Sequence, residues 1–189
     1  MRKLSYYVGT TIDGFIAGPG EEIDFFPLAD DMMEFISAGV PETVPTHIRA
    51  QSGIDAANRR FDTVVMGRGT YQPALDIDVT SPYAHLRQYV VSTTIPEIAD
   101  PGVELVPGDP IGLVRRLKKE EGLDVWLAGG GKLAGSLLPE IDELIIKRYP
   151  VAVGAGIPAF TGEFRPLPFT LVDTRTFSNG AAVTTYARA

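Results

Sequence analysis

The feature that most constrains the fold is a set of short apolar runs, each followed at once by glycine or small polar residues. Residues 63–66 precede Gly67, residues 89–91 precede Ser92, and residues 125–128 precede three consecutive glycines. Continuous apolar runs of this length are typical of strands that are buried on both faces. The pattern therefore predicts an α/β fold, with a central, mostly parallel sheet that is flanked by helices.

The segments around these runs supply the remaining elements of the N-terminal part. Apolar residues that alternate over 4–8 predict a first strand, and residues 13–20 form a glycine-rich loop after it. Helical spacing of apolar residues predicts a helix over 28–38, and residues 40–52 look irregular. A further helix is predicted from the Asp109-Pro110 start to about Gly122, because aspartate caps helices and proline suits their first position.

The C-terminal part predicts antiparallel strands. One strand-like segment runs from Leu144 to about Val153, and a second begins at Phe169. The dipeptide Asn179-Gly180 joins this second segment to residues 182–186, and Asn-Gly is the strongest short hairpin signal. The sheet is therefore expected to end in an antiparallel hairpin, and the length of 189 residues suits a single domain, residues 1–189.

Composition excludes several classes of chemistry. The chain has no cysteine and only two histidines, so it can form neither a disulfide framework nor a thiolate metal site, and we expect no metal. A net charge of −7 argues against a nucleic-acid partner. No run of about 18 apolar residues and no signal-peptide pattern at the start is present, so we expect a cytoplasmic protein with no membrane partner.

Three turns at the ends of predicted strands carry residues suited to phosphate. In residues 128–133 the glycines let bare backbone approach a ligand and point free amides at an anion. Arg68 and Thr70 follow one strand, and Ser92 and Thr93 follow another, at the edge where parallel strands end together. A ligand with several phosphates is one interpretation. Tight turns without a ligand, with a solvated arginine and capping hydroxyls, are the alternative.

Two widespread phosphate motifs do not fit. Residues 154–159 superficially resemble a dinucleotide fingerprint, but Pro158 would disrupt the expected helix and no acidic residue lies about 20 positions on. Residues 128–133 are not a P-loop, because Leu133 stands where a serine or threonine would bind magnesium. Neither a Rossmann nor a P-loop protein is therefore predicted.

Candidate proton donors are carboxylates near the first loop, namely Asp13, Asp24, Asp30 and Asp31. Any one of these residues is more often a solvated or capping group than a catalytic one. His47 and His85 lie in polar surroundings and are interpreted as surface residues.

The order of the motifs resembles that of a known superfamily. Asp13-Gly14-Phe15-Ile16-Ala17, Met66 to Tyr71, Val91-Ser92-Thr93 and Ala128 to Leu133 follow one another as in the dihydrofolate reductase superfamily. Asp13-Gly14, the triple glycine, Asp142-Glu143-Leu144 and residues 150–160 resemble, more closely, the reductase domain of bifunctional riboflavin deaminase-reductases and its stand-alone relatives. The resemblance spans nearly the whole chain and implies a dihydrofolate reductase-like fold.

The resemblance also implies a cofactor and a site. It implies that NADPH is held by Gly67, Arg68, Thr70, Ser92, Thr93, Gly129, Gly130, Gly131, Lys132 and Leu133, with Ile16 and Ala17 bordering the nicotinamide. Folate reductases place a catalytic carboxylate five residues after an aromatic one, and Asp30 stands five after Phe25. Asp30 and Asp13 are therefore the catalytic candidates.

The function that the resemblance implies is hydride transfer from NADPH to a pteridine or to a 5-amino-6-(5-phosphoribosylamino)uracil-like substrate. The zinc-deaminase signature is absent, since its cysteine ligands are absent. A homodimer is expected. Two alternatives stay open: a catalytically silent nucleotide-binding or sensory module of the same fold, and a flavin- or folate-binding storage protein.

Overall fold

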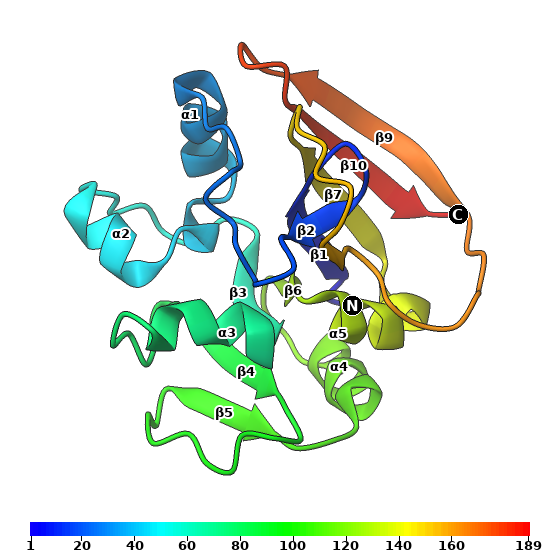
Figure 1. Ribbon diagram of the computed structural model, residues 1–189. Helices are drawn as coiled ribbons and strands as arrows, with labels where there is room; N and C mark the ends of the chain where they lie inside the picture. The colour runs from blue at the N-terminus through cyan, green and yellow to red at the C-terminus, as the bar shows by residue number, and fades with distance from the viewer.

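A computed structural model describes residues 1–189 and shows an eight-stranded sheet packed between helices (Figure 1). The strands are β1 (Leu4–Thr10), β3 (Phe61–Gly67), β4 (Arg87–Val91), β5 (Val103–Val106), β6 (Asp124–Gly129), β7 (Glu143–Arg148), β9 (Phe169–Thr176) and β10 (Ala182–Arg188). Their order across the sheet is β5-β4-β3-β6-β1-β7-β10-β9. The first six strands in this order, from β5 through β7, are parallel to one another. β10 pairs antiparallel with β7, and β9 pairs antiparallel with β10. The expected α/β fold, with a mostly parallel sheet, is confirmed.

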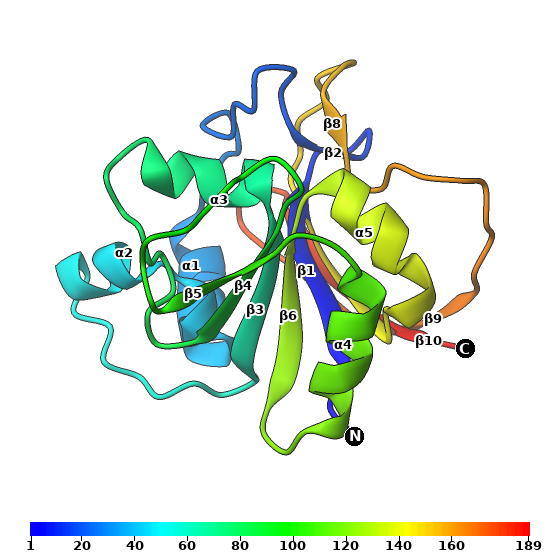
Figure 2. The same ribbon diagram turned by 90° about the horizontal axis from the view of Figure 1, so that it is seen from below.

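The helices cover the two faces of the sheet unequally. They are α1 (Asp30–Gly39), α2 (Thr46–Gln51), α3 (Arg68–Leu75), α4 (Pro110–Lys119) and α5 (Gly131–Leu137), with short 3-10 turns at Pro41–Thr43 and Leu138–Glu140. Met32 of α1 and Tyr71 of α3 belong to one buried apolar cluster, whereas Val114 of α4 and Leu137 of α5 belong to another. The sheet separates the two clusters, as Figure 2 shows with α1, α2 and α3 on one side and α4 and α5 on the other. No helix is long and apolar enough to span a bilayer.

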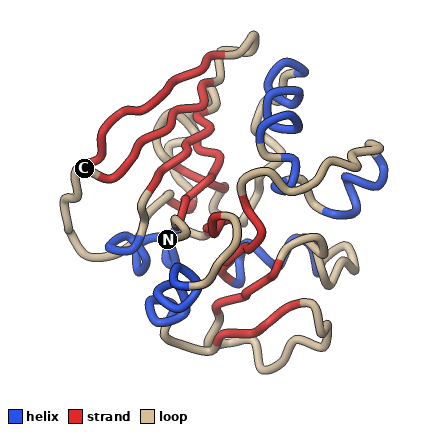
Figure 3. Tube along the Cα trace, turned by 180° about the vertical axis from the view of Figure 1, so that it is seen from behind, coloured by secondary structure: helices blue, strands red, loops and turns tan.

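Local sequence signals explain the elements that were predicted most accurately. The first strand, α1 and the three buried strands lie where the apolar pattern places them. The side chain of Asp109 accepts a hydrogen bond from the backbone N–H of Gly112 at 2.8 Å, so it caps α4 as expected. The Asn179-Gly180 turn joins β9 to β10, and Gly180 has φ +83°, which glycine adopts without strain. Figure 3 shows the resulting long hairpin at one end of the sheet.

The prediction that residues 40–52 are irregular is wrong, since they contain a 3-10 turn and α2. Contacts from distant segments hold this region. The side chain of Arg49 donates to the carbonyl oxygens of Pro41 and Ala56 at 2.7 and 2.6 Å. His85, expected at the surface, is partly buried, and its ring nitrogens lie 3.2 Å from the Thr46 hydroxyl and 2.8 Å from the Glu42 carbonyl oxygen. The apolar periodicity of the sequence does not predict such contacts between distant residues.

Three strand predictions also need correction. β7 ends at Arg148 rather than near Val153, because Pro150 has no N–H to donate to a ladder. β5 was not predicted, and it makes one edge of the sheet parallel instead of antiparallel. The glycine-rich loop contains β2 (Phe15–Ala17), which pairs antiparallel with β8 (Ile157–Pro158) in a separate two-stranded sheet. β2, β5 and β8 have three, four and two residues, too few for a strand pattern to stand out in the sequence.

A buried carboxylate fastens the start of β3. The side chain of Glu42 is fully buried and accepts hydrogen bonds from the backbone N–H groups of Arg60 and Phe61, both at 2.7 Å, and of Arg59 at 3.2 Å. A carboxylate has acceptor capacity for all three donors, whereas water cannot reach them. Glu42 therefore links the segment after α1 to the strand that carries Gly67.

We expect Glu42→Gln to lower the free energy of unfolding by about 2–3 kcal/mol, because a hydrogen bond to a charged group contributes about 1.5–3 kcal/mol and the amide NH₂ would face backbone donors. Urea denaturation measures this change. The exposed Glu34→Gln on α1 serves as the control and should change stability by less than about 0.5 kcal/mol. Equal stability of the two variants would contradict the assigned role of Glu42.

Candidate functional site

The six parallel strands end along one edge of the sheet, and two neighbours among them send their connections to opposite faces. α3 follows β3 to the face that carries α1, whereas α5 follows β6 to the face that carries α4. Figure 2 shows this divergence. Adjacent parallel strands whose connections diverge leave a crevice at their carboxyl ends, where α/β proteins bind ligands. The crevice here lies between Gly67 and Gly129.

The two glycine turns meet in this crevice. A Cβ atom placed on Gly67 would lie 3.5 Å from the backbone nitrogen of Gly130 and 3.6 Å from the carbonyl oxygen of Gly129. Gly129 has φ +141°, and the peptide bond between Gly129 and Gly130 is cis. The Thr70 hydroxyl oxygen is 3.0 Å from where a Cβ of Gly129 would lie. Four predicted cofactor residues are thus brought together, and three of them, Gly67, Gly129 and Gly130, have no side chain.

Charged and polar groups flank this bare backbone. Arg68 is the first residue of α3 and Lys132 the second of α5, and both side chains are exposed. Ser92 is buried, and its hydroxyl oxygen accepts from the N–H groups of Thr94 and Ile95, both at 3.1 Å. Thr93 is exposed on the same turn. The serine therefore shapes the turn after β4, while Arg68, Thr93 and Lys132 stay accessible to a ligand.

The third glycine of the triple and Leu133 have a packing role. A Cβ on Gly131 would overlap the carbonyl oxygen of Pro158, and the carbonyl oxygen of Gly131 accepts from the N–H of Thr161 at 2.9 Å. Leu133 is buried in the α4–α5 cluster. Gly131 therefore holds the β8 segment against the glycine turn.

β2 and β8 carry the residues expected to border the nicotinamide. Ala17 is buried and Ile16 is partly buried against the α4–α5 cluster. A Cβ on Gly156 would overlap the carbonyl oxygen of Ala17, so only glycine allows this close approach. Because β8 pairs with β2 and also contacts Gly131, the Ile16–Ala17 segment is connected through β8 to the glycine turn.

Asp13 anchors the loop that leads to β8. Its carboxylate accepts from the N–H of Gly154 at 2.7 Å and from the N–H of Val153 at 3.2 Å. A hydrogen bond from Thr11 and those backbone N–H groups lower the pKa of Asp13. Hydrogen bonds to the ionised form favour that form. Asp13 is thus an ionised polar anchor at neutral pH and is poorly suited to give up a proton.

The other catalytic candidate lies at the start of α1. The Asp30 side chain is exposed and makes no hydrogen bond. Its neighbour Asp31 accepts from the backbone N–H and the hydroxyl of Ser178 at 2.8 and 2.9 Å, and these bonds lower its pKa. Neither carboxylate is brought into the crevice by a contact, so the role predicted for Asp30 stays a prediction.

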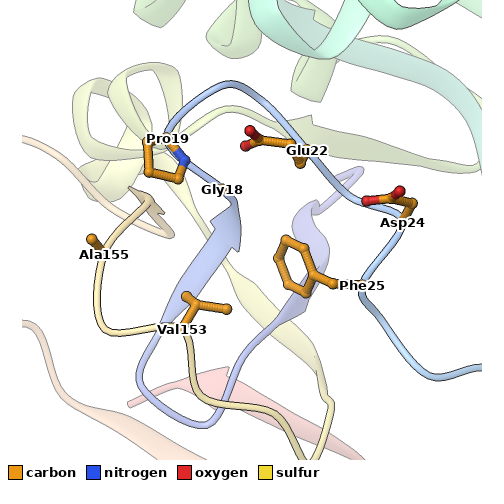
Figure 4. Close-up of a pocket in the computed structure, with 7 residues that line it drawn as sticks. All are labelled: Gly18, Pro19, Glu22, Asp24, Phe25, Val153 and Ala155. Carbon is orange, nitrogen blue, oxygen red and sulfur yellow. The ribbon is translucent and has the colours of Figure 1, made fainter.

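An open pocket of about 390 Å³ adjoins this region (Figure 4). It lies between the segment after β2 and the segment before β8, and its lining comprises Gly18, Pro19, Glu22, Asp24, Phe25, Val153 and Ala155. The Phe25 ring faces Val153 across the pocket in Figure 4. An aromatic face, apolar walls and two carboxylates suit a small polar heterocycle.

Sequence reasoning did not single out one acidic residue near the crevice, Glu21. Glu21 has φ +68°, and its carboxylate oxygen lies 3.1 Å from where a Cβ of Gly69 would be. This places a negative charge beside the first turn of α3, next to Arg68. The signal in the sequence was weak, because Glu21 lies in an acidic loop with no distinguishing neighbours.

Solved structures of other proteins share this architecture. Dihydrofolate reductase from Enterococcus faecalis, complexed with NADP(H) and RAB-propyl, has 17% identity and a TM-score of 0.67, with 98% of this chain and 96% of that chain covered. The deaminase/5-amino-6-(5-phosphoribosylamino)uracil reductase of Thermotoga maritima has 15% identity and a TM-score of 0.65, with 100% and 57% covered. The fold is therefore that of the dihydrofolate reductase-like proteins, as expected.

Closer relatives define the family. Residues 2–183 match the RibD C-terminal domain, and the chain belongs to this family. A candidate riboflavin biosynthesis protein from Shewanella sp. PV-4 has 26% identity and a TM-score of 0.72, with 100% of this chain and 99% of that chain covered. Bacillus subtilis strain 168 has two relatives, both named as uncharacterized: YwjB, 30% identical over 84% of this chain and 83% of YwjB, and YyaP, 26% identical over 98% and 94%. The family and the neighbours support a reductase-type function.

We expect Gly131→Ala to destabilise the protein by about 1–3 kcal/mol, because the added methyl group would overlap the Pro158 carbonyl oxygen and force β8 away from the glycine turn. Thermal unfolding measures the change. Gly39→Ala is the matched control, since nothing lies within 4 Å of a Cβ there, and it should leave the melting temperature unchanged or raise it. Equal melting temperatures would show that the turn is not packed as described.

Proposed function

We propose that the protein is a cytoplasmic NADPH-dependent reductase that transfers hydride to a carbon–nitrogen double bond. This bond belongs either to a pteridine ring or to the ribosyl imine form of a 5-amino-6-(5-phosphoribosylamino)uracil-like substrate. The observation that carries the proposal is the meeting of the two bare glycine turns at the divergence of β3 and β6, with Arg68 beside them. A pyrophosphate could approach this backbone closely, and a guanidinium is well shaped to bind phosphate. Bound NADPH would supply the hydride and the protein the orientation.

The surroundings of the crevice support a nicotinamide dinucleotide in particular. A second open pocket lies beside β5 and the start of α4, lined by residues from Glu104 to Arg116. β5 lies beyond β4 in the sheet order, so this pocket is on the far side of the Ser92–Thr93 turn from Gly67, in the direction in which a long ligand would extend. At the other end, β2 and β8 offer the apolar wall of Ile16 and Ala17. The NADP(H) complex of the Enterococcus faecalis relative supports the same choice.

We expect Arg68→Ala to weaken NADPH binding about 10- to 100-fold, because a charge-assisted hydrogen bond contributes about 1.5–3 kcal/mol. Gly130→Val should weaken binding as well, since its side chain would fill the space next to Thr70. Isothermal titration calorimetry measures both affinities. Arg165→Ala, at an exposed position of the 161–168 segment, is the control and should bind NADPH like the wild type. Unchanged affinity in both site variants would remove the site assignment.

Glu21→Gln is a control that should change NADPH affinity in the opposite direction. Removing a negative charge beside the first turn of α3 should strengthen NADPH binding, and the gain should shrink at high ionic strength, because salt screens an exposed charge. Weaker binding in this variant would show that the phosphates lie elsewhere.

Turnover separates a reductase from a silent module of the same fold. Purified protein with NADPH is mixed with dihydrofolate or with 5-amino-6-(5-phosphoribosylamino)uracil, and the absorbance of reduced nicotinamide is followed. A substrate-dependent decrease supports the reductase. Binding without any decrease, for either substrate, favours the nucleotide-binding or sensory module, and a yellow purified protein would favour flavin storage.

We propose further that the protein is a homodimer joined through β9. This strand forms an edge of the sheet, every residue after Phe169 is exposed, and Leu171 and Val172 are 58% and 60% exposed. Antiparallel pairing of two copies about Thr174 would set Asp173 opposite Arg175 of the partner subunit, twice over. Such opposite-charge pairs stabilise paired strands, and pairing removes an exposed edge.

Light scattering after size exclusion should give about twice the chain mass of 20.4 kDa for the wild type and a monomer for the double variant Leu171→Lys, Val172→Lys. Lysine on an edge strand opposes pairing through charge repulsion. Phe164→Ser, which changes an exposed apolar residue outside β9, should remain dimeric. A monomeric wild type would reject the proposal.

A further inference from the structure

One lysine lies inside the sheet rather than on its rim. Lys147 is the fifth residue of β7, and it is in register with Gly9 of β1 and Val183 of β10. Its neighbours two positions away on either side, Ile145 and Tyr149, belong to the apolar cluster on the α1 side. Side chains two apart on a strand point to the same face. Lys147 therefore extends into the α1 side of the sheet, near the carboxyl ends of β1 and β7.

Aromatic rings and a glycine surround the side chain of Lys147. Its Nζ lies 4.3 Å from the centre of the Tyr7 ring, within the range of a cation–π interaction. A Cβ on Gly9 would lie 3.2 Å from the Tyr149 ring and 4.0 Å from Cε of Lys147. A larger residue at position 9 would therefore crowd the lysine, and glycine leaves the space that the ammonium group needs.

No carboxylate neutralises this lysine. The ion pairs of the structure use Arg2, Arg60, Arg87, Arg115 and Lys118, and none includes Lys147. Desolvation by burial is the only cause of its altered acidity, and it lowers the pKa of Lys147 to about 8. Lys147 as a residue is partly exposed. A largely desolvated ammonium group without a counter-ion still costs stability, which an apolar side chain at this position would not.

The titratable groups on the surrounding elements are occupied with other partners. Tyr7 and Tyr149 have pKa values raised by burial, so they stay neutral. The carboxylate of Glu42 accepts three backbone N–H bonds and that of Asp31 binds Ser178. On β9, Arg175 stacks over the rings of Phe35 and Phe177. The charge of Lys147 is thus available for a ligand.

A chain of aromatic contacts links Lys147 to the open pocket. Tyr149, beside Lys147, has its ring centre 4.8 Å from that of Phe26, and Phe26 lies 4.6 Å from Phe25. Phe25 lines the pocket of Figure 4. The end of β1 is joined to β2 by a hydrogen bond from the N–H of Thr11 to the carbonyl oxygen of Phe15 at 2.8 Å. Lys147 therefore adjoins the segments that frame the candidate substrate region.

We propose that Lys147 is the proton donor of the reduction, an inference that rests on the proposed function. Bound NADPH would supply a hydride, with its two electrons, that forms a C–H bond at the carbon of the substrate C=N bond. The π electrons of that bond move to nitrogen, which takes a proton from Nζ of Lys147. The N–H bond of the ammonium breaks, a neutral amine remains, and a solvent proton restores it.

The acidity of Lys147 suits this role. An ordinary lysine, with a pKa near 10.4, holds its proton too tightly to be an efficient acid at neutral pH. General acids work best when their pKa lies near the working pH. With a pKa of about 8, Lys147 is mostly protonated at pH 7 and gives up its proton more readily. The activity should therefore be present below pH 8 and be lost as the pH rises through that value.

Two variants test the role, with NADPH and whichever of the two substrates named above is turned over. Lys147→Met keeps length but has no proton to give, and Lys147→Arg keeps the charge but is too weak an acid. In both, kcat should fall about 10²- to 10⁴-fold, KM and the calorimetric NADPH affinity should change little, and the alkaline limb near pH 8 should disappear. A kcat within twofold of the wild type, with the limb retained, would overturn the proposal.

A measurement without substrate distinguishes failure of the inference about Lys147 from failure of the proposed function. Reductive methylation with ¹³C-formaldehyde labels Lys147 and the other lysines, Lys3, Lys118, Lys119 and Lys132, and Lys147→Met identifies its NMR signal. A titration midpoint near 8 for the Lys147 signal supports the inference. A midpoint above 10 overturns it. Failure of the wild type to bind NADPH or to turn over either substrate would count against the proposed function instead.

Discussion

The structure depends on the divergence of two connections at the middle of the sheet. β3 and β6 are adjacent in the sheet, while α3 and α5 leave them toward opposite faces, so the turns after the two strands meet at the carboxyl edge of the sheet. The apolar clusters on the two faces make this divergence obligatory, since each helix buries its apolar side against its own face. The crevice is therefore a consequence of how the core is divided.

Glycine residues shape the crevice in two physical ways. At Gly67, Gly129 and Gly130 the missing side chain lets the two turns touch. At Gly131 and Gly156 it lets β8 and β2 pack against the turn and against each other. The same packing that holds the Ile16–Ala17 segment in place thus also positions the glycine turn. The proposed cofactor site and the local fold therefore share these contacts.

The carboxylates and the lysine near the site have different roles because they have different partners. Asp13 and Asp31 are hydrogen-bonded to backbone N–H groups, which keeps them ionised and fixes the loops that surround the site. Lys147 lies among aromatic rings without a counter-ion, which makes its proton easier to lose. Asp13 and Asp31 therefore hold loops in place, whereas the cation Lys147 is the group near the site whose proton is easier to lose.

The sequence by itself determined the parallel sheet, the capped helix after Asp109, the Asn179-Gly180 hairpin and the turns that carry Gly67 and the triple glycine, because each follows from a short-range pattern of burial, capping or backbone freedom. Only the tertiary structure decided that the turns after β3 and β6 touch, that residues 41–51 form helical turns, and that β2 pairs with β8, since these depend on residues far apart in the chain. It also decided the surroundings of Lys147. A lysine within the run Leu144–Tyr149 departs from the strand pattern, but its lack of a carboxylate partner emerges only when β1, β7 and α1 are packed together.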